Sequence, residues 1–329
     1  MNEFDLIRRL QGIISASDAG LSQTGSVGMG DDAAVVTVDA GRQLVITVDT
    51  MVAGVHFPID TPAADIACKA LAVNLSDLAA MGADPRWFFL ALTLPQADER
   101  WLEEFATGLA TLAAASGIEL AGGDTTSGPL SITITALGVV NRGEALLRST
   151  AHAGDLVVVS GTPGLAAAGL MQWRAGEAVD SQAWRAFTRP QPRLQLGRAL
   201  HGKATACIDV SDGLAADLGH VTRASKVGAE IWLDRLPRPG VLGKLPLEQC
   251  WNLQLGGGDD YELCFSLPPQ LEREVPALAA QGGVGLTVIG RLIKGSGLKF
   301  LGRDGREFVP DRSGFDHFPG GGHGSEAPV

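Results

Sequence analysis

Hydrophobic and polar positions change along the chain between the two-residue period of strands and the longer period of helices. The stretch PLSITITALGVV, residues 129–140, carries an apolar side chain at alternate positions and predicts a half-buried strand. A helix is predicted at 62–82, where Thr61 and Pro62 form a favourable start, and another at 98–115, ended by Gly117. Further strands are expected at 44–48, 155–161, 204–210, 228–233, 261–267 and 285–292, and further helices directly after residue 161 and near 181–201, 212–226 and 269–281.

This alternation predicts an α/β (α+β) protein. Because 329 residues exceed one ordinary domain, we expect two domains, each with its own core. The pattern restarts after residue 141, so the predicted domains are 1–141 and 142–318. The tail 319–329 has few apolar side chains and is expected to be disordered.

Composition indicates the cellular compartment of the protein and excludes some classes of binding partner. Acidic residues outnumber basic ones by 11 (37 against 26), which disfavours nonspecific binding to nucleic acid. The four cysteines are scattered without a C-x-x-C spacing, so buried thiols in a reducing compartment are expected. The N-terminus lacks an apolar signal core, and charged or polar residues interrupt the most apolar segment, 64–83. We therefore expect a cytoplasmic protein that does not bind membranes.

Aspartates recur at the ends of predicted strands, the edge at which α/β folds place their ligands. Any one of them is as readily explained by a turn or a helix cap. Their repetition in both halves of the chain favours a shared role. They are Asp32 in GDDAAVV, Asp49 in VITVDT, Asp124 in AGGDTT, and Asp209 and Asp212 in IDVSDG.

Asp77 differs because it lies inside an apolar helix, on the same face as Asn74. A buried carboxylate needs a cation or strong donors, whereas an exposed helix face needs neither, and this residue alone leaves both interpretations open. If the aspartates converge, their repulsion raises their pKa values unless divalent cations neutralise it. Because each Mg²⁺ takes only one or two protein carboxylates, the excess predicts several Mg²⁺ ions around a polyphosphate.

Phosphate groups also need donors. Gly122 and Gly123 offer main-chain amides, and Arg148 is a candidate phosphate clamp, although a surface arginine is the commoner explanation of such a residue. The stretch GRALHGKA has the spacing of a Walker loop but ends in Ala204, where a hydroxyl is required, so we reject it. His56 follows Asp49 by seven residues, and a lone histidine is more often structural than functional.

Seven segments together resemble a known family. In collinear order, from about residue 3 to 318, they are GDDAAV, VDTMVAGVHF, KALAVNLSDLAAMGADP, GGDTT, IDVSDGL, GGGDDYELCF and GFDHF. They resemble the thiamine-monophosphate kinases of the aminoimidazole ribonucleotide synthetase-like ATP-binding superfamily. The resemblance implies two domains with mixed sheets flanked by helices, and a homodimer formed through the N-terminal sheet. It also implies transfer of the ATP γ-phosphate to thiamine monophosphate, with several Mg²⁺ ions bound.

The resemblance also implies roles for individual residues. Position 259 departs from the family, whose GGEDYEL reads GGDDYEL here, so that Asp259 is one methylene shorter and a bridging water becomes an alternative to direct contact. The implied metal ligands are Asp32, Thr47, Asp49, Asp77, Asp124, Asp209 and Asp212; the implied ATP contacts are Gly122, Gly123, Asp124, Arg148 and Ser211; and the implied substrate contacts are His56, Asp259 and Phe315.

The acceptor in this reaction is already an anionic phosphate monoester, so we expect direct in-line transfer without a protein nucleophile. Three alternatives remain. The first is another ATP-dependent synthetase or kinase of the superfamily, and the second is a two-metal phosphohydrolase. The third is a noncatalytic nucleotide- or metal-binding protein whose family chemistry has decayed, which only the change at position 259 supports.

Overall fold

The computed structural model describes residues 12–14, 33–177 and 181–315, which form two compact units. The first unit comprises the described residues up to Leu78 together with Ala83–Arg142. The second comprises Ala79–Gly82 and the described residues from Gly143 onward. The predicted disordered tail, 319–329, lies outside the described residues.

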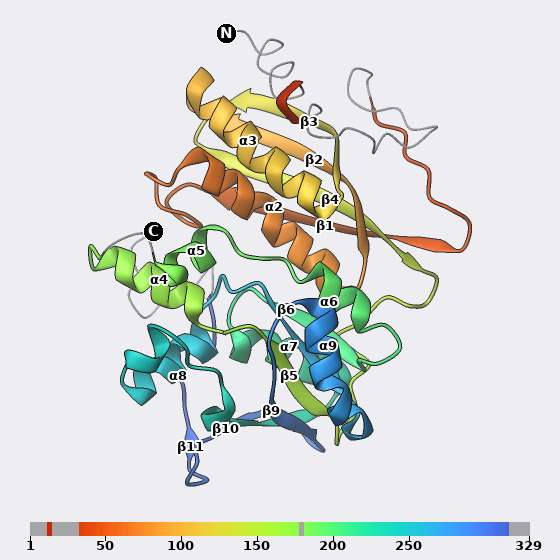
Figure 1. The fold of residues 1–329 in the computed structure, drawn as a ribbon, viewed down its shortest axis with the longest axis vertical. Helices are drawn as coiled ribbons and strands as arrows, with labels where there is room; N and C mark the ends of the chain where they lie inside the picture. Colours follow the sequence, from red (N-terminus) through yellow and green to blue (C-terminus); the bar gives the residue numbers. More distant parts are fainter. Residues whose placement is uncertain (1–11, 15–32, 178–180, 316–329) are drawn as a thin grey trace. The chain divides into compact units, whose positions relative to one another are not determined.

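The first unit is built on a four-stranded sheet with the strand order β1-β4-β2-β3. Strand β3 is parallel to β2, and the other two pairs are antiparallel. Two helices lie against this sheet (Figure 1). The elements are β1 (Arg42–Val52), α2 (Ala63–Ala80), β2 (Asp84–Leu94), α3 (Glu99–Ser116), β3 (Glu119–Ser127) and β4 (Ser131–Asn141).

Both helices predicted in this half are present, and the ends of α3 follow from local chemistry. The Asp98 carboxylate accepts hydrogen bonds from the main-chain N–H groups of Arg100 and Trp101, at 2.9 and 3.1 Å, which caps the first turn. Gly117 ends the helix with a φ of 67°, a left-handed conformation that glycine adopts without a steric penalty.

The second unit contains a seven-stranded sheet with the order β11-β10-β7-β9-β5-β8-β6, in which only the β10–β7 pair is parallel. Its strands are β5 (Leu156–Ser160), β6 (Ala206–Val210), β7 (Gly228–Trp232), β8 (Glu262–Leu267), β9 (Leu286–Ile293), β10 (Leu298–Leu301) and β11 (Glu307–Phe308). Its α-helices are α4 (Leu165–Arg174), α5 (Gln182–Thr188), α6 (Leu194–Ala199), α7 (Leu214–Ser225), α8 (Leu247–Gly256) and α9 (Val275–Gly282). Two mixed sheets flanked by helices confirm the predicted fold class.

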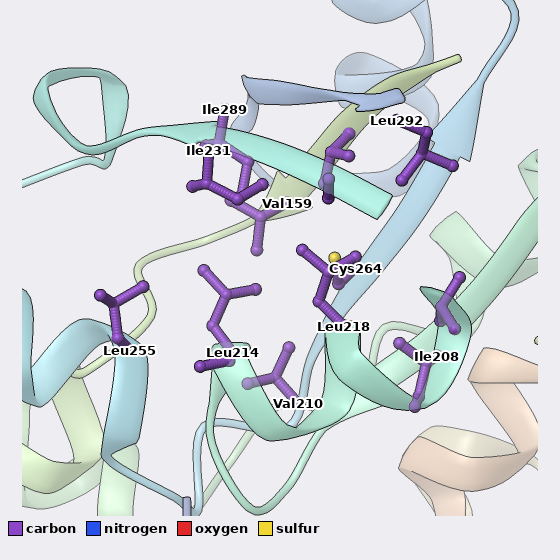
Figure 2. Packing of buried hydrophobic residues seen from close by; sticks show 14 of the residues in the cluster. Val159, Ile208, Val210, Leu214, Leu218, Ile231, Leu255, Cys264, Ile289 and Leu292 are labelled. Atoms are coloured by element: carbon purple, nitrogen blue, oxygen red, sulfur yellow. The ribbon is translucent and has the colours of Figure 1, made fainter. Parts of the chain in front are cut away.

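The core of the second unit joins α7 to the sheet. Figure 2 shows Leu214 and Leu218 of the helix directed toward strand residues that include Val159 and Ile289. All four side chains are at most 2% exposed. Burial of each such aliphatic side chain contributes about 1.5–3 kcal/mol, so the start of α7 is held firmly on the sheet.

The helix predicted near 181–201 is two helices, α5 and α6. Pro190 and Pro192 lie between them and cannot donate the main-chain hydrogen bonds that a continuous helix requires. The prediction also missed β2, β3, α8, β10 and β11. Asp124, which we expected in a loop after an apolar run, lies inside β3.

The cysteines are free, and Cys207, Cys250 and Cys264 are buried, while Cys68 is half-buried. Among the described residues, no helix is long and apolar enough to cross a membrane.

Candidate functional site

In the first unit, β1 and α2 bring together two of the predicted metal ligands. The hydroxyl Oγ1 of Thr47 donates a short hydrogen bond to Oδ2 of Asp77. Asp49 lies two residues farther along β1 and therefore points to the same face of the sheet as Thr47. Asn74, which shares the helix face of Asp77, is fully buried. Asp77, half-buried on α2, thus has a hydroxyl donor on β1, as expected for a carboxylate that is partly removed from water.

Asp124 and Asp49 point to opposite faces of the first sheet. The hydroxyls of Thr50 and Thr133 are 2.8 Å apart on one face of the sheet, and the register continues this row through β2 to Asp124. Asp49 precedes Thr50 and points to the opposite face. Strands β1 and β3 are also the two edges of the sheet, so one copy of this sheet does not bring Asp49 and Asp124 together.

The glycine pair before Asp124 has a structural role in the sheet. Gly122 and Gly123 pair with β2 instead of forming a loop. A side chain at position 123 would collide with the main-chain oxygen of Leu90 on β2. Close approach of two strands therefore explains this glycine without a ligand, and its predicted contact with ATP stays a prediction.

A turn after β1 fixes the orientation of His56. Its ring nitrogen Nδ1 accepts a hydrogen bond from the main-chain N–H of Val52 at 3.0 Å. The neutral ring therefore carries its proton on Nε2. The ammonium group of Lys69, only 2% exposed on α2, donates to the main-chain oxygen of His56 at 3.0 Å. The sequence drew attention to Lys69 only as an interruption of an apolar segment.

In the second unit, the carboxylate of Asp217 organises the segment that connects β6 to α7. Its Oδ2 accepts hydrogen bonds from the main-chain N–H groups of Ser211, Asp212 and Gly213, at 3.0, 3.1 and 3.1 Å. Burial, followed by the charge of Asp212, raises the pKa of Asp217 to about 7, although the three N–H donors oppose this shift. Asp209, 3% exposed, is the second-last residue of β6 and precedes this turn.

The loop before β8 is attached to the same segment. The main-chain N–H of Asp259 donates to the Ser211 oxygen, and that of Tyr261 to the Val210 oxygen, both at 2.8 Å. Asp259 and Tyr261 have φ values of 66° and 50°, unusual for residues other than glycine. The Tyr261 hydroxyl donates to the Asp259 carboxylate at 3.1 Å. Asp259, whose carboxylate is predicted to contact the substrate, is thus held in place by main-chain hydrogen bonds to Val210 and Ser211.

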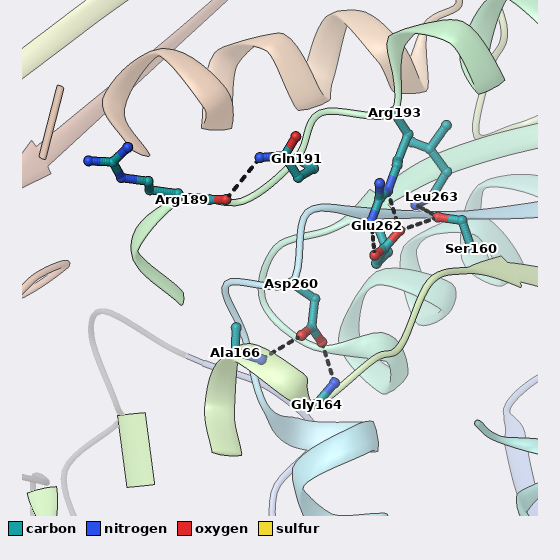
Figure 3. Close-up of polar contacts among 9 residues, drawn as sticks. All are labelled: Ser160, Gly164, Ala166, Arg189, Gln191, Arg193, Asp260, Glu262 and Leu263. Carbon is teal, nitrogen blue, oxygen red and sulfur yellow. Dashed lines mark hydrogen bonds and ion pairs between the residues drawn. The ribbon is translucent and has the colours of Figure 1, made fainter. Parts of the chain in front are cut away.

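Asp260 and Glu262 anchor this loop from its other side (Figure 3). Asp260 accepts hydrogen bonds from the main-chain N–H groups of Gly164 and Ala166 at the start of α4, at 2.6 and 3.3 Å. Burial raises the pKa of Asp260 well above its ordinary value. The guanidinium of Arg193 donates through Nε to the Glu262 carboxylate at 2.7 Å, so the buried charge of Glu262 is paired.

Two further predicted contacts lie at opposite ends of α7. The main-chain N–H of Phe315 donates to the Asp212 oxygen at 2.9 Å, and its side chain is 52% exposed. The Arg148 oxygen accepts a hydrogen bond from the Ser225 hydroxyl at 2.8 Å, which ties this arginine's main chain to the end of α7. Asp32 lies outside the described residues.

Sequence reasoning missed Lys69, Arg193, Asp217, Asp260 and Glu262 as residues that position the site. Asp217 offered a signal, because a carboxylate in the first turn of an apolar helix calls for main-chain donors. Asp260 and Glu262 lay within the quoted segment GGGDDYELCF, but their partners are far away in sequence. Arg193 gave no local signal.

The oxygen atoms of Thr47 and Asp77 match the ligands that Mg²⁺ prefers. Among the described residues, no three His, Cys, Asp or Glu side chains are grouped so that they could hold a metal ion. Magnesium does not require such a group, because one or two carboxylates with water and phosphate oxygens complete its coordination. Thr47 and Asp77 supply the hard oxygen atoms that this ion prefers, in direct contact with each other. The residues present therefore fit Mg²⁺.

Comparison with known proteins defines the class. The AIR synthase related protein N-terminal domain matches residues 30–140, and the corresponding C-terminal domain matches residues 152–302. The chain therefore has the two-domain arrangement of the AIR synthase related proteins. HypE hydrogenase maturation proteins, at 18–21% identity, share this fold.

Full-length relatives narrow the assignment further. A thiamine-monophosphate kinase of Haemophilus influenzae is 45% identical, with 97% of this chain and 98% of the relative aligned. The crystal structure of thiamine-monophosphate kinase from Stenotrophomonas maltophilia has a TM-score of 0.84 at 44% identity, covering 91% of this chain and 96% of that one. AaThiL complexed with AMPPCP and TMP has a TM-score of 0.74 at 30% identity, covering 93% and 96%. The chain belongs to the thiamine-monophosphate kinase family and is an enzyme of that family.

Proposed function

We propose that this protein transfers the γ-phosphate of ATP directly to the phosphate of thiamine monophosphate, which yields ADP and thiamine diphosphate. One observation carries the proposal: a relative that aligns with 93% of this chain was solved with AMPPCP, an ATP analogue, and TMP together. The expected location is the cytoplasm, where ATP and Mg²⁺ are available.

Each unit contributes a prearranged part of the machinery. In the first unit, His56 is the proposed substrate contact, its ring is oriented by the N–H of Val52, and Lys69 holds the turn that carries it. In the second unit, Asp217 fixes the main chain of Ser211 and Asp212, the positions proposed to contact ATP and metal. Such fixed groups favour transfer because they need no rearrangement when charge moves.

Several Mg²⁺ ions are proposed to assist the transfer. Asp49, Asp77, Asp209 and Asp212, with the Thr47 hydroxyl, would hold them, and Asp124 and Asp32 are the further ligands expected from the family. When bound, Mg²⁺ supplies positive charge that offsets the repulsion between the two phosphate-bearing substrates. The acceptor phosphate is itself the nucleophile, so no side chain of this protein has to attack ATP.

We further propose a homodimer formed through the face of the first sheet that the helices do not cover. On β1, Leu44, Ile46 and Val48 point to this face and are 37%, 60% and 60% exposed. A row of exposed aliphatic side chains on an edge strand favours association. Asp124 points to the same face, so a second copy that covers this face would cover Asp124 as well.

The test is a reaction with purified protein, ATP, Mg²⁺ and thiamine monophosphate, in which chromatography follows ADP and thiamine diphosphate. Equal amounts of both products, lost on addition of EDTA, are expected. ADP without thiamine diphosphate would point to hydrolysis or another acceptor, and no turnover would favour a noncatalytic role. Rapid-quench labelling with γ-labelled ATP should leave the protein unlabelled, and a trapped phosphoprotein would overturn direct transfer.

A further inference from the structure

A cavity of about 910 Å³ lies in the second unit between α7, the loop before β10 and the segment after β11. Phe300, 6% exposed, and Leu298 of β10 give it an apolar floor. No residue proposed above as a metal, ATP or substrate contact lines this cavity. Its size is in the range of small-molecule binding sites, and the function proposed above does not use it.

Every ionisable side chain in the lining is basic, in a chain whose net charge is −11. His220, Arg223 and Lys226 follow one another at three-residue intervals along α7 and its cap, and so border the cavity on one side. The guanidinium Nη2 of Arg223 donates to Nδ1 of His220 at 3.1 Å, which leaves its other N–H groups available. Within the part of the chain that the structure describes, no carboxylate forms an ion pair with Arg223 or Lys226.

Glycines keep the cavity open. A Cβ atom at Gly219, on the helix wall, would lie 3.1 Å from the guanidinium of Arg223 and 3.9 Å from Leu298. A larger side chain there would fill the space next to the arginine. On the opposite wall, Gly295 and Gly297 have φ values of 110° and 84°, and the main-chain oxygen of Gly297 is fixed by the N–H of Ala229 at 3.0 Å. The wall is therefore set by the backbone.

We propose that this cavity is a second binding site of the protein, for a small phosphate-bearing compound with an apolar ring. The ring would lie on Phe300 and Leu298, and the phosphate would pair with Arg223 and Lys226. Arginine binds phosphate oxygens in a two-pronged geometry, and a neighbouring ammonium adds charge. A purely apolar ligand would leave both cations unpaired, and a free anion would leave the apolar floor exposed to water.

Pyridoxal 5′-phosphate is the probe, since it combines an aromatic ring, a phosphate and an aldehyde that reacts with lysine. Arg223 would hold its phosphate, and its aldehyde carbon condenses with the Lys226 amine, which exchanges its pairing with the phosphate for the imine, and releases water. Borohydride then adds hydride to the imine carbon, and water supplies the proton to nitrogen. The full chain is treated in EDTA, which removes Mg²⁺, and labelled lysines are identified by mass spectrometry. Lys244, an exposed lysine of the same unit that does not line the cavity, is the internal reference.

Labelling of Lys226 should exceed that of Lys244 by about tenfold, the effect of one charge-assisted hydrogen bond, and pyrophosphate should suppress the excess. Arg223→Ala and Gly219→Leu should abolish the preference, whereas Arg303→Ala, an exposed arginine outside the cavity, should leave it unchanged. Thermal unfolding checks that the Gly219→Leu variant folds. If that variant does not fold, the labelling of the Arg223→Ala variant alone decides whether the cavity binds the probe. Equal labelling of the two lysines, or a preference that survives Arg223→Ala, would overturn the proposal.

Discussion

The ammonium group of Lys69 donates a hydrogen bond to the main-chain oxygen of His56, at 3.0 Å, from a position that is 2% exposed. A buried ammonium is retained only where its charge finds partners, because desolvation of an unpaired charge is costly. The contact lies at the turn that orients the His56 ring. Lys69 is thus a positioning residue for the proposed substrate contact.

We expect Lys69→Met to raise the KM for thiamine monophosphate by about tenfold while the KM for ATP changes little, because loss of one hydrogen bond to a charge loosens only the His56 turn. Methionine has a similar volume and no charge, so folding should persist. Steady-state kinetics with each substrate varied in turn measure the split. Lys244→Met, at an exposed position, is the matched control. Equal increases in both KM values would contradict a specific role at His56.

Asp77→Asn should lower kcat by at least about a hundredfold, since an amide cannot supply the charge that Mg²⁺ requires, while its oxygen still accepts from Thr47. Far-ultraviolet circular dichroism and the urea midpoint should stay close to those of the parent protein. Near-normal turnover at saturating Mg²⁺ would show that Asp77 is not a metal ligand.

Asp217→Ala should lower the free energy of unfolding by about 2–3 kcal/mol, because it leaves three main-chain N–H groups without their acceptor. It should also raise the KM for ATP, since the same groups position Ser211 and Asp212. Asp217→Asn keeps an acceptor oxygen and should recover part of both losses. Urea titration and kinetics on the pair provide the measurement. Identical behaviour of the two variants would mean that the hydrogen bonds have no role in positioning.

Asp260 gives a prediction for pH dependence. Burial raises its pKa in the folded protein above the ordinary value of 3.8. The folded state therefore keeps a proton that the unfolded chain has released, and the free energy of unfolding falls as pH rises from about 4 toward the folded pKa. Asp260→Asn removes this titration. The stability of the parent protein relative to the variant should thus decline with rising pH in urea titrations between pH 4 and 8, and parallel profiles would refute the assignment.

Val48→Glu tests the proposed dimer. A charge within the exposed aliphatic row of β1 should separate the two copies, because an unpaired carboxylate resists burial in an apolar interface. Light scattering after gel filtration should show a dimer for the parent protein and a monomer for the variant. Thr111→Glu on the exposed side of α3 should remain dimeric. A parent protein that is itself monomeric would end this proposal.

Local patterns in the sequence were sufficient to predict those helices and strands whose ends carry a clear signal. Gly117 and the apolar period fixed the end of α3, and alternating side chains marked the start of β4. Strand β2 gave no alternation, because PRWFFLALTL is apolar at almost every position. Strand β3 contains a glycine pair that is typical of turns, and only its pairing with β2 makes it a strand.

The site was predicted as separate residues, and its geometry depends on contacts between distant segments. Thr47 and Asp77 are 30 positions apart, so only packing of α2 on β1 joins them. The opposite faces of Asp49 and Asp124 follow from the sheet register, which no local motif encodes. The role of Lys69 could not be predicted either, because its partner, the main-chain oxygen of His56, lies outside the apolar helix that contains Lys69.

The two main-chain bonds that join the loop before β8 to the end of β6 limit how the loop can accommodate an aspartate at position 259. Compared with the glutamate that the family resemblance implies at this position, Asp259 reaches one methylene less far, and a freely moving loop could slide forward to restore the distance. Here the N–H groups on either side of Asp260 are fixed at 2.8 Å to Ser211 and Val210, so any slide would drag the start of α7 with it. Under the proposed contact of Asp259 with the substrate, compensation therefore falls to an inserted water or to a shifted substrate, and not to a movement of the loop.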